Sequence, residues 1–146
     1  MATFTDDQIA GILRASPVVA VLGVHTERDK PAYYVPDYLH AHGYTIYGVN
    51  PRLAGEVLFG APVHATLAEL AVPIDLVDVF RRPEAIPAHV PDILAMSPRP
   101  KVVWFQLGIR NDAAARELEA AGITVVQDRC TLAEHRRLQL GKPSAT

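Results

Sequence analysis

Short apolar runs alternate with helix-like segments along this chain, and that alternation restricts its fold more than any other feature. Five runs rich in β-branched and aromatic residues cover 18–23, 45–49, 76–80, 101–106 and 124–128. Continuous apolar runs of this length are typical of strands buried on both faces of a parallel sheet. Parallel neighbours require crossover connections, which the intervening segments can supply. We therefore predict an α/β fold, a Rossmann-like three-layer sandwich in which helices flank a five-stranded, mostly parallel sheet.

Capping and stop signals mark helices between and beyond these runs. Thr5 and Gln8 have the spacing of a capping box, which predicts a helix to about residue 15. The apolar period that begins at Val35 predicts a second helix, which Gly43 ends. Asn111 can cap an Ala-rich helix that stops before residue 122.

The remaining segments give mixed signals. Thr131 and Glu134 form a second capping box, which predicts a last helix to about residue 140. Residues 86–94 keep a helical period, but Pro91 lies among them, so we expect a kink or a later helix start. Residues 52–73 are expected to be irregular, with only a short helical turn near residues 67–70.

Composition and charge favour one ordinary globular domain. The chain has 146 residues, of which 49% are hydrophobic and 21% are charged. No linker divides it, so we expect a single domain over 1–146 with a frayed tail at 141–146. The net charge of −2 offers nucleic acid and acidic membranes no general attraction, so any anion site must be local.

The sequence also suggests where such a protein works. No apolar run approaches the ~20 residues of a membrane span, and Asp6 and Asp7 stand where a signal peptide would carry Lys or Arg. We expect a cytoplasmic protein with a small-molecule ligand. Its protein partner is not indicated, and a monomer and a small homo-oligomer both remain open.

Catalytic and metal-binding patterns are hard to find. The six histidines lack a metal-binding spacing, and Cys130 is the only cysteine, so no metal site is expected. There is no nucleophile elbow and no P-loop. Asp75 and Asp78 are better interpreted as structural polar groups than as an acid/base pair. No catalytic residue is therefore predicted.

In open α/β sheets, ligands bind outside the carboxyl ends of the strands, which directs attention to the segments there. After the first run, Gly23-Val24-His25 allows a tight turn whose backbone N–H groups can hold a pyrophosphate. The later glycines of a G-x-G-x-x-G fingerprint are absent. Lys30 could reach a phosphate and Tyr33 could bind one through its hydroxyl, although a solvated lysine and a half-buried tyrosine are equally consistent with the sequence.

The second run ends in Val49-Asn50-Pro51-Arg52. A dinucleotide site usually places an Asp or Glu here to bind a ribose 2′-hydroxyl. An amide, a rigid proline and a cation stand here instead. This pattern argues against NAD and for a ligand that carries extra phosphate near its ribose, because the planar guanidinium of Arg52 suits a phosphate monoester.

The other runs also end in candidate binding residues. Phe80-Arg81-Arg82-Pro83 concentrates positive charge, and the Phe80 ring offers a face for adenine. Elsewhere such an arginine pair is usually a solvated turn, but its position at a strand end favours a ligand role here. Gln106 and Gly108 follow the fourth run, and Gly108 permits close backbone approach. Cys130 follows the fifth run, at the expected N-terminus of a helix. Its thiol can have a pKa lowered by that position, or it can be a buried, inert residue.

Several stretches of the chain together match one known family. They are Val21-Leu22-Gly23, Lys30-Pro31-Ala32-Tyr33, Gly43-Tyr44, Val49-Asn50-Pro51, Val77-Asp78-Val79-Phe80-Arg81, Val103-Trp104-Phe105-Gln106-Leu107-Gly108-Ile109 and Asp128-Arg129-Cys130. The chain resembles, over nearly its whole length, the small bacterial CoA-binding proteins built on the CoA-binding domain of the succinyl-CoA synthetase α-subunit. The resemblance implies a Rossmann-like fold that binds coenzyme A across the strand ends.

The resemblance also implies a role for each strand end. The Gly23-Val24 turn would meet the pyrophosphate, and the Asn50-Pro51-Arg52 corner would meet the ribose and its 3′-phosphate. Residues 80–83 would line the nucleotide cleft, and residues 106–108 with Cys130 would lie toward the pantetheine arm. His25 stands where a small Ser is common, so the phosphate contact of this turn is either lost or made by an imidazole donor.

We therefore expect a module that binds coenzyme A or an acyl-CoA without catalytic machinery of its own, as a carrier, sensor or regulator. Thioester synthesis is not expected, because the synthetases phosphorylate a histidine on a second domain and use an ATP-grasp partner, and neither is present in the sequence. Two alternatives remain. One is a small enzyme that uses CoA thioesters or NAD(P), and the other is a redox protein in which Cys130 forms a mixed disulfide with CoA.

Overall fold

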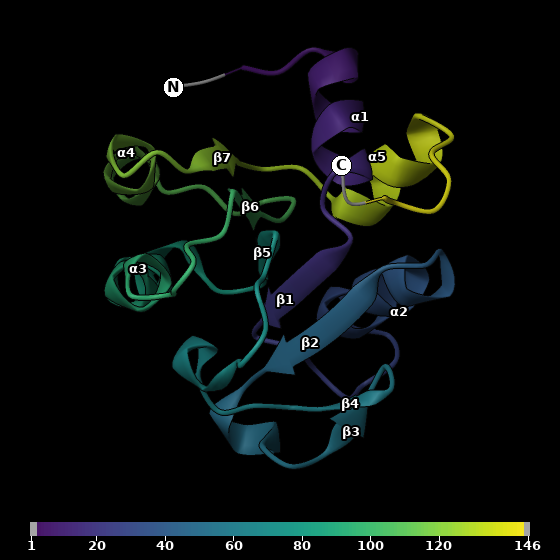
Figure 1. The fold of residues 1–146 in the computed structure, drawn as a ribbon, viewed down its shortest axis with the longest axis vertical. Coiled ribbons are helices and arrows are strands. Elements are labelled where there is room, and N and C mark those ends of the chain that lie inside the picture. The colour runs from purple at the N-terminus through teal and green to yellow at the C-terminus, as the bar shows by residue number, and fades with distance from the viewer. Residues whose placement is uncertain (1–2, 145–146) are drawn as a thin grey trace.

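A five-stranded parallel sheet forms the centre of the protein (Figure 1). The computed structural model describes residues 3–144. The strands of this sheet are β1 (Val18–Leu22), β2 (Thr45–Val49), β5 (Leu76–Val79), β6 (Val102–Phe105) and β7 (Thr124–Val126), in the spatial order β2-β1-β5-β6-β7. Every neighbouring pair is parallel. The prediction of a Rossmann-like α/β fold is confirmed.

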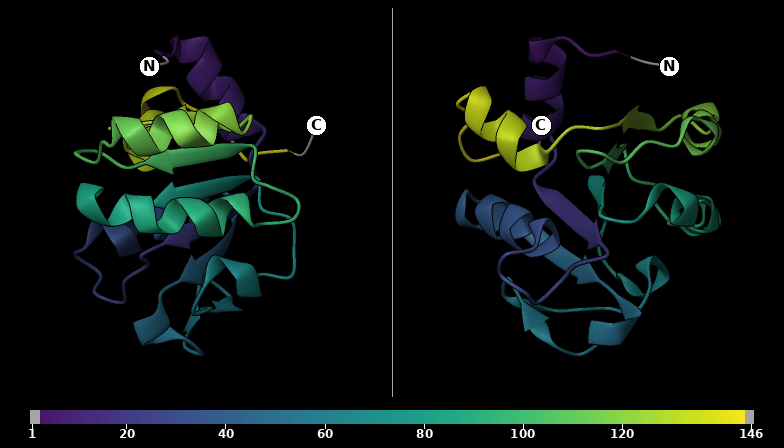
Figure 2. Two further views of the ribbon diagram at one scale, coloured as in Figure 1. Left: turned by 90° about the vertical axis from the view of Figure 1, so that its left-hand side faces the viewer. Right: turned by 180° about the vertical axis from the view of Figure 1, so that it is seen from behind.

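Helices cover both faces of the sheet and make the three layers (Figures 1 and 2). One face carries α1 (Asp6–Arg14), α2 (Pro31–Ala41) and α5 (Thr131–Arg137), and the other carries α3 (Ile86–Leu94) and α4 (Asp112–Ala120). Alternate residues of each strand enter different cores. In β1, Ala20 packs toward α3 and α4, while Val21 packs toward α1 and α2. This explains why the strands are apolar without alternation.

Most helix ends follow the local sequence signals. The capping box of Thr5 and Gln8 is present at α1, and the Asn111 side chain accepts a hydrogen bond from the Ala114 N–H at the start of α4. Gly43 and Gly122 follow α2 and α4 with positive φ angles of 95° and 88°. These parts of the helix prediction are confirmed, because short-range contacts alone determine them.

Two helix predictions are wrong. Cys130, not Thr131, is the N-cap of α5, and Thr131 is the first helical residue, because its hydroxyl is turned inward and donates to Asp78 at 3.0 Å. A later start for the helix predicted over residues 86–94 is also wrong, since α3 begins at Ile86 and continues through Pro91. The buried face of α3 against the sheet outweighs the local cost of that proline.

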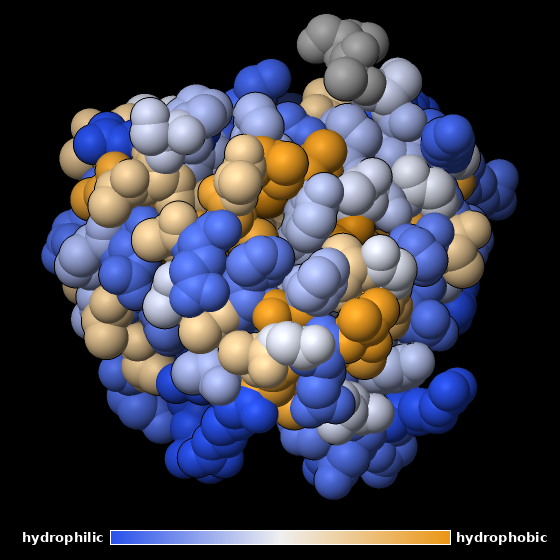
Figure 3. All heavy atoms as spheres, turned by 60° about the horizontal axis from the view of Figure 1, so that its bottom comes forward, coloured by the Kyte–Doolittle hydropathy of each residue, from blue (hydrophilic) through white to orange (hydrophobic). Residues whose placement is uncertain are grey.

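The segment after β2 contains the short helical turn expected near residues 67–70, and more structure than the sequence indicates elsewhere. It holds two short 3-10 helices, η1 (Pro51–Leu53) and η2 (Leu67–Glu69), and a hairpin of β3 (Val57–Leu58) and β4 (Ala61–Pro62). The hairpin turn needs a positive φ of 54° at Phe59, a residue that does not favour it. On the end of the molecule that carries this hairpin, hydrophobic side chains lie in separate groups among hydrophilic ones (Figure 3).

The C-terminal segment is packed against the rest of the protein as far as it is described. Pro143 is buried, and the N–H of Ser144 donates to the carbonyl of Arg14 at 3.0 Å. Residues 143 and 144 of the expected frayed tail thus make contacts with the rest of the protein, while residues 145–146 lie outside the described part; fraying of this tail stays a prediction. Within residues 3–144, no helix is long and apolar enough to cross a membrane.

Candidate functional site

The chain leaves β1 and β5 in opposite directions, and this places a crevice between their carboxyl ends. After β1 it passes through α2 to β2 on one side, and after β5 it passes through α3 to β6 on the other. Such a reversal of strand order is the usual position of a ligand site in open α/β sheets. Three adjoining hollows lie here, and Gly23 and Arg81 border all three.

Gly23 lets the two loops of the crevice touch. Its φ is +90°, and its N–H donates to the carbonyl of Val49 at 2.9 Å. A Cβ atom at this position would lie 2.6 Å from the Phe80 carbonyl oxygen and 3.1 Å from Cδ of Arg81. Glycine is required both by the backbone conformation and by the close approach. The turn after β1 is therefore held against the cationic loop after β5.

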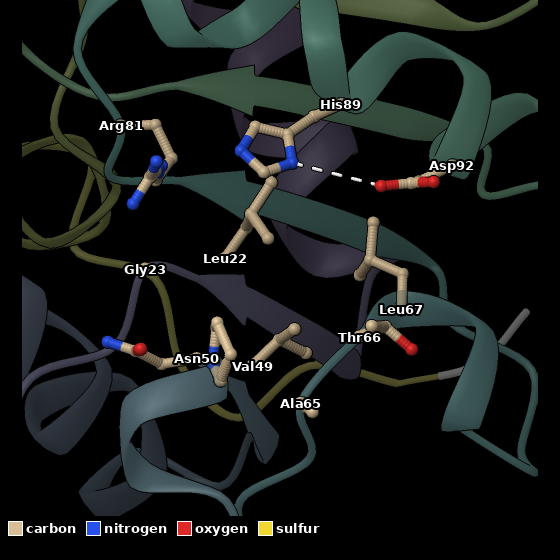
Figure 4. Close-up of a pocket in the computed structure, with 11 residues that line it drawn as sticks. Leu22, Gly23, Val49, Asn50, Ala65, Thr66, Leu67, Arg81, His89 and Asp92 are labelled. Carbon is tan, nitrogen blue, oxygen red and sulfur yellow. Dashed lines mark ion pairs between the residues drawn. The ribbon is translucent and has the colours of Figure 1, made fainter.

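The smallest hollow, of about 210 Å³, is called here the narrow hollow (Figure 4). Leu22, Val49 and Leu67 give it apolar walls, and Figure 4 shows Arg81 and His89 on one side and Asn50 on the opposite side. Nδ1 of His89 lies 4.0 Å from a carboxylate oxygen of Asp92. Burial, and next the charge of Arg81, lower the pKa of His89. The imidazole is thus an uncharged polar group near neutral pH.

The cationic hollow, of about 780 Å³, lies beside the narrow hollow and is bordered by Arg52, Arg81 and Arg82. No ion pair involves any of these three arginines within residues 3–144, whereas Arg110, Arg129 and Arg137 each contact a carboxylate. Exposed guanidinium groups without carboxylate partners are suited to bind phosphate oxygens. The cations that the sequence predicts at two separate strand ends therefore converge on one hollow.

The third, apolar hollow has a volume of about 520 Å³ and extends toward the ends of β6 and β7. Phe80, Tyr34, Leu107 and Cys130 are among its borders, with Lys30 at its edge. Burial raises the pKa of the Cys130 thiol, against the effect of backbone N–H groups at the start of α5. The lowered thiol pKa that a helix N-terminus can produce is absent at this residue.

Two of the predicted site residues also hold the site together. Asn50 donates from Nδ2 to the carbonyl of Val24 at 2.9 Å and accepts from the N–H of Arg52 at 3.0 Å, so it fixes the corner after β2 against the turn after β1. His25 accepts at Nδ1 from the N–H of Glu27 at 3.0 Å. In the neutral ring the proton is then on Nε2, which leaves a donor for a ligand.

A buried polar cluster lies beneath the apolar hollow. Gln106 donates from Nε2 to Asp78 at 2.6 Å and to Thr131 at 2.9 Å, and all three side chains are buried. Burial raises the pKa of Asp78 to about 7, although the hydrogen bonds that Gln106 and Thr131 donate to this carboxyl oppose the shift. Asp75 accepts from the N–H of Val18 at 2.9 Å. Both aspartates are engaged inside the protein, as expected for structural groups.

Comparison with known proteins identifies the family. The profile of a family described as a CoA binding domain matches residues 17–136. The chain belongs to this CoA-binding family. A Bacillus subtilis relative, the protein YneT, is 33% identical over 128 residues, which are 88% of this chain and 92% of that protein. The resemblance drawn from the sequence is confirmed.

Solved structures show the same fold. A Thermus thermophilus protein is 44% identical, with a TM-score of 0.88 over 92% of this chain and 99% of its own. A Pyrococcus horikoshii protein is 33% identical, with a TM-score of 0.86 over 93% of each chain. A dinucleotide-forming acetyl-coenzyme A synthetase from Ca. Korarchaeum cryptofilum matches at 16% identity over 77% of this chain and 26% of its own, with a TM-score of 0.63. That last likeness concerns the fold alone.

The hollows of this CoA-binding domain bring together most of the residues expected from the sequence. Those that border at least one hollow are Gly23, His25, Lys30, Val49, Asn50, Pro51, Arg52, Phe80, Arg81, Arg82, Pro83, Gln106 and Cys130. Three others border none of them. Val24 is fully buried, Tyr33 packs against Phe59 with ring centroids 5.3 Å apart, and the Gly108 N–H donates to Asp128 at 2.6 Å.

Sequence reasoning missed several residues of the narrow and apolar hollows. Tyr34, not its neighbour Tyr33, faces the apolar hollow, and Thr66 and Leu67 border the narrow hollow from the segment expected to be irregular. His89 was also missed. It lies three residues after the buried Ile86 of α3, so the helical period could have indicated that it faces the sheet.

Proposed function

We propose that this protein binds coenzyme A or an acyl-CoA across the carboxyl ends of its parallel strands, without catalytic machinery of its own. The observation that carries the proposal is the set of three guanidinium groups around the cationic hollow, which are free of ion pairs within residues 3–144. This hollow adjoins both the narrow hollow and the apolar hollow. Coenzyme A has the matching order of parts: a base, a phosphorylated ribose with a pyrophosphate, and a long uncharged arm.

The adenine fits the narrow hollow. Its walls of Leu22, Val49 and Leu67 can cover the flat faces of a base, while Asn50 and His89 offer polar atoms at its edge. This assignment differs from the expectation that the Phe80 ring holds the adenine. Phe80 borders the other two hollows instead, where it would cover the start of the pantetheine arm.

The phosphates fit the cationic hollow. The turn after Gly23, the Nε2 donor of His25 and the guanidinium groups of Arg81 and Arg82 surround the position proposed for the pyrophosphate. Arg52 stands at the corner after β2, where the ribose 3′-phosphate would lie. The pantetheine arm would then extend along the apolar hollow toward Cys130.

A cytoplasmic carrier, sensor or regulatory module fits this arrangement better than an enzyme. The raised pKa of Cys130 keeps its thiol protonated, and the Asp78 carboxyl is enclosed by Gln106 and Thr131. Neither group is poised as a nucleophile or base. Turnover of any acyl-CoA by the purified protein would contradict this part of the proposal.

Calorimetry tests the ligand and the 3′-phosphate assignment together. We expect one CoA per chain, and an affinity for dephospho-CoA at least about tenfold lower, since hydrogen bonds to charged groups contribute about 1.5–3 kcal/mol. Arg52→Ala should remove most of this difference. Arg116→Ala on α4 is the matched control, because Arg116 is exposed and borders none of the three hollows. Equal affinity of the parent for both ligands would refute the 3′-phosphate site.

A mixed disulfide between Cys130 and CoA is a second candidate, because Cys130 borders the hollow proposed for the arm that ends in the CoA thiol. In that step the Cys130 thiol first loses its proton to solvent, which the raised pKa makes slow at neutral pH, and its sulfur then attacks CoA disulfide. The Cys130–CoA disulfide forms as the disulfide bond of the reagent breaks, and one CoA thiolate leaves. Mass spectrometry of the protein after incubation with CoA disulfide should show one adduct that Cys130→Ser lacks. No adduct on the parent protein would exclude this candidate.

A further inference from the structure

Two large hydrophobic side chains are exposed at the mouth of the apolar hollow. Leu107 is 69% exposed and Tyr34 is 44% exposed, and both border this hollow. Only four large hydrophobic side chains within residues 3–144 are exposed in this way, and the other two are Val57 and Val72. Hydrophobic side chains gathered at a hollow indicate a surface that a ligand or partner covers.

The exposure of Leu107 is fixed by the local backbone. Leu107 lies in a tight turn in which the N–H of Ile109 donates to the carbonyl of Gln106 at 2.9 Å. Gly108 completes the turn with a φ of 82°, and its N–H donates to Asp128 at 2.6 Å. The N–H of Asp128 donates back to the carbonyl of Ile109 at 3.1 Å. These bonds hold the leucine outward.

The position of Tyr34 is also fixed by backbone hydrogen bonds. Pro31 begins α2, and the N–H groups of Tyr33 and Tyr34 both donate to the carbonyl of Lys30, at 2.9 and 3.0 Å. Tyr34 is therefore fixed in the first turn of the helix. The hollow is thus bordered by apolar side chains from α2 and from the turn after β6.

The apolar hollow is continuous with the cationic hollow. Gly23, His25, Phe80, Arg81 and Arg82 border both of them. A ligand that occupies the two together would need an anionic part near the arginines and an uncharged, apolar part near Leu107. An apolar side chain of another protein would fill the two hollows less well, because it would leave the arginines without a counter-charge.

We propose that the outer part of the apolar hollow holds the acyl group of an acyl-CoA, and that the protein binds apolar acyl-CoA thioesters more tightly than free CoA. The inference rests on the proposed function and specifies its ligand class. The sulfur end of a pantetheine arm directed toward Cys130 would bring a thioester-linked chain between Leu107 and Tyr34. Burial of each methylene group contributes about 0.8 kcal/mol, which is about fourfold in affinity.

Calorimetry with CoA, acetyl-CoA, butyryl-CoA and hexanoyl-CoA tests the inference. Because the hollow is open to solvent, we expect each methylene to raise the affinity by about twofold to fourfold, so that hexanoyl-CoA binds at least about tenfold more tightly than CoA. Leu107→Asn should reduce this ratio to about two. Val57→Asn is the matched control, because Val57 is 68% exposed on β3 and borders none of the hollows, and it should preserve the ratio.

The outcomes separate this inference from the proposed function. Equal affinities across the series would overturn the acyl site and leave CoA binding intact. A ratio that persists in Leu107→Asn would also overturn it. Failure of CoA and of every acyl-CoA to bind would overturn the proposed function itself.

Discussion

Arg81 is the side chain on which the proposed site depends most, because it borders all three hollows. No carboxylate neutralises it within residues 3–144. We predict that Arg81→Ala lowers the affinity for CoA by roughly tenfold to a hundredfold. Arg81→Lys should recover only part of this loss, because an ammonium lacks the planar pair of donors. Calorimetry measures both effects against Arg116→Ala, and an unchanged affinity in Arg81→Ala would contradict the prediction.

Asp78 should make the stability of the protein depend on pH. Burial raises the pKa of this carboxyl to about 7, while an unfolded chain releases the proton near 3.9. Between about pH 4 and pH 7, the native state therefore binds about one proton more than the unfolded chain. The resulting stabilisation is complete below about pH 4 and is lost as the pH rises through 7, with a slope of at most about 1.4 kcal/mol per pH unit.

Asp78→Asn tests this linkage. The variant keeps an acceptor for Gln106 but cannot titrate, so its free energy of unfolding relative to the parent should rise between pH 5 and 8, by roughly 1–3 kcal/mol. His135 has the opposite effect: burial lowers its pKa, so it destabilises the protein as the pH falls below about 6.5. That contribution is present in both proteins and cancels in the difference. Urea unfolding of both proteins at several pH values gives these free energies. A difference between variant and parent that stays constant with pH would refute the linkage to Asp78.

At the scale of elements, the close contact between the ends of β1 and β5 is set by Gly23. A Cβ at this position would meet the Phe80 carbonyl oxygen at 2.6 Å. We predict that Gly23→Ala lowers the free energy of unfolding by roughly 2–4 kcal/mol and weakens CoA binding, because the two loops must separate. Gly55→Ala is a matched control. Gly55 has the same φ of +90°, but a Cβ there meets nothing within 4 Å.

The Gly55→Ala control separates the cost of the steric clash with Phe80 from the cost of the left-handed backbone conformation. Gly55→Ala should cost only the left-handed conformation, about 1–2 kcal/mol, and should leave CoA affinity unchanged within about twofold. Urea denaturation and calorimetry on both variants give the two comparisons. Equal destabilisation by the two substitutions would show that the contact with Phe80 is not restrictive.

The elements also show how far local sequence signals reach. The five strands and the caps at Thr5 and Asn111 were predictable because neighbours in the sequence determine them. The error at Thr131 has a different origin, since its hydroxyl bonds Asp78, which is 53 residues away. The β3–β4 hairpin was missed because its strands have two residues each and its turn puts Phe59 at a positive φ.

The same distinction applies to the candidate site. The strand-end rule located Gly23, Asn50 and Arg81 because the carboxyl ends of parallel strands share one edge of the sheet. Thr66 and His89 come from segments that reach this edge only through tertiary packing. The place of Thr66 follows from how the segment after β2 folds back onto that strand, where the backbone N–H of His64 donates to the carbonyl of Gly48 at 3.0 Å, and no local pattern contains that information. For His89, the helical period indicates that it faces the sheet, but not that it borders the same hollow as Leu22 and Val49.

At the scale of the whole molecule, the protein has a net charge of −2 but concentrates three arginines around the cationic hollow. An anionic ligand therefore gains nothing from the protein at long range, and its binding depends on contact with the exposed arginines. Salt screens such contacts, because the Debye length falls from about 8 Å at physiological ionic strength to 3 Å at 1 M. The affinity for CoA should decrease with salt although the protein is acidic overall.

Thermal unfolding combines these effects in one measurement. The proposed ligand contacts the loops after β1, β2 and β5 only in the folded chain, so CoA at a hundred times its dissociation constant should stabilise the protein by about 2.7 kcal/mol. For a domain of this size that corresponds to a rise in Tm of roughly 5–10 °C. The rise should be smaller with the same concentration of dephospho-CoA, and smaller for CoA in 1 M NaCl than in 0.15 M NaCl. Equal shifts for CoA and dephospho-CoA would refute the 3′-phosphate contact, and a CoA shift that is the same at both salt concentrations would show that the arginines of the cationic hollow do not bind phosphate.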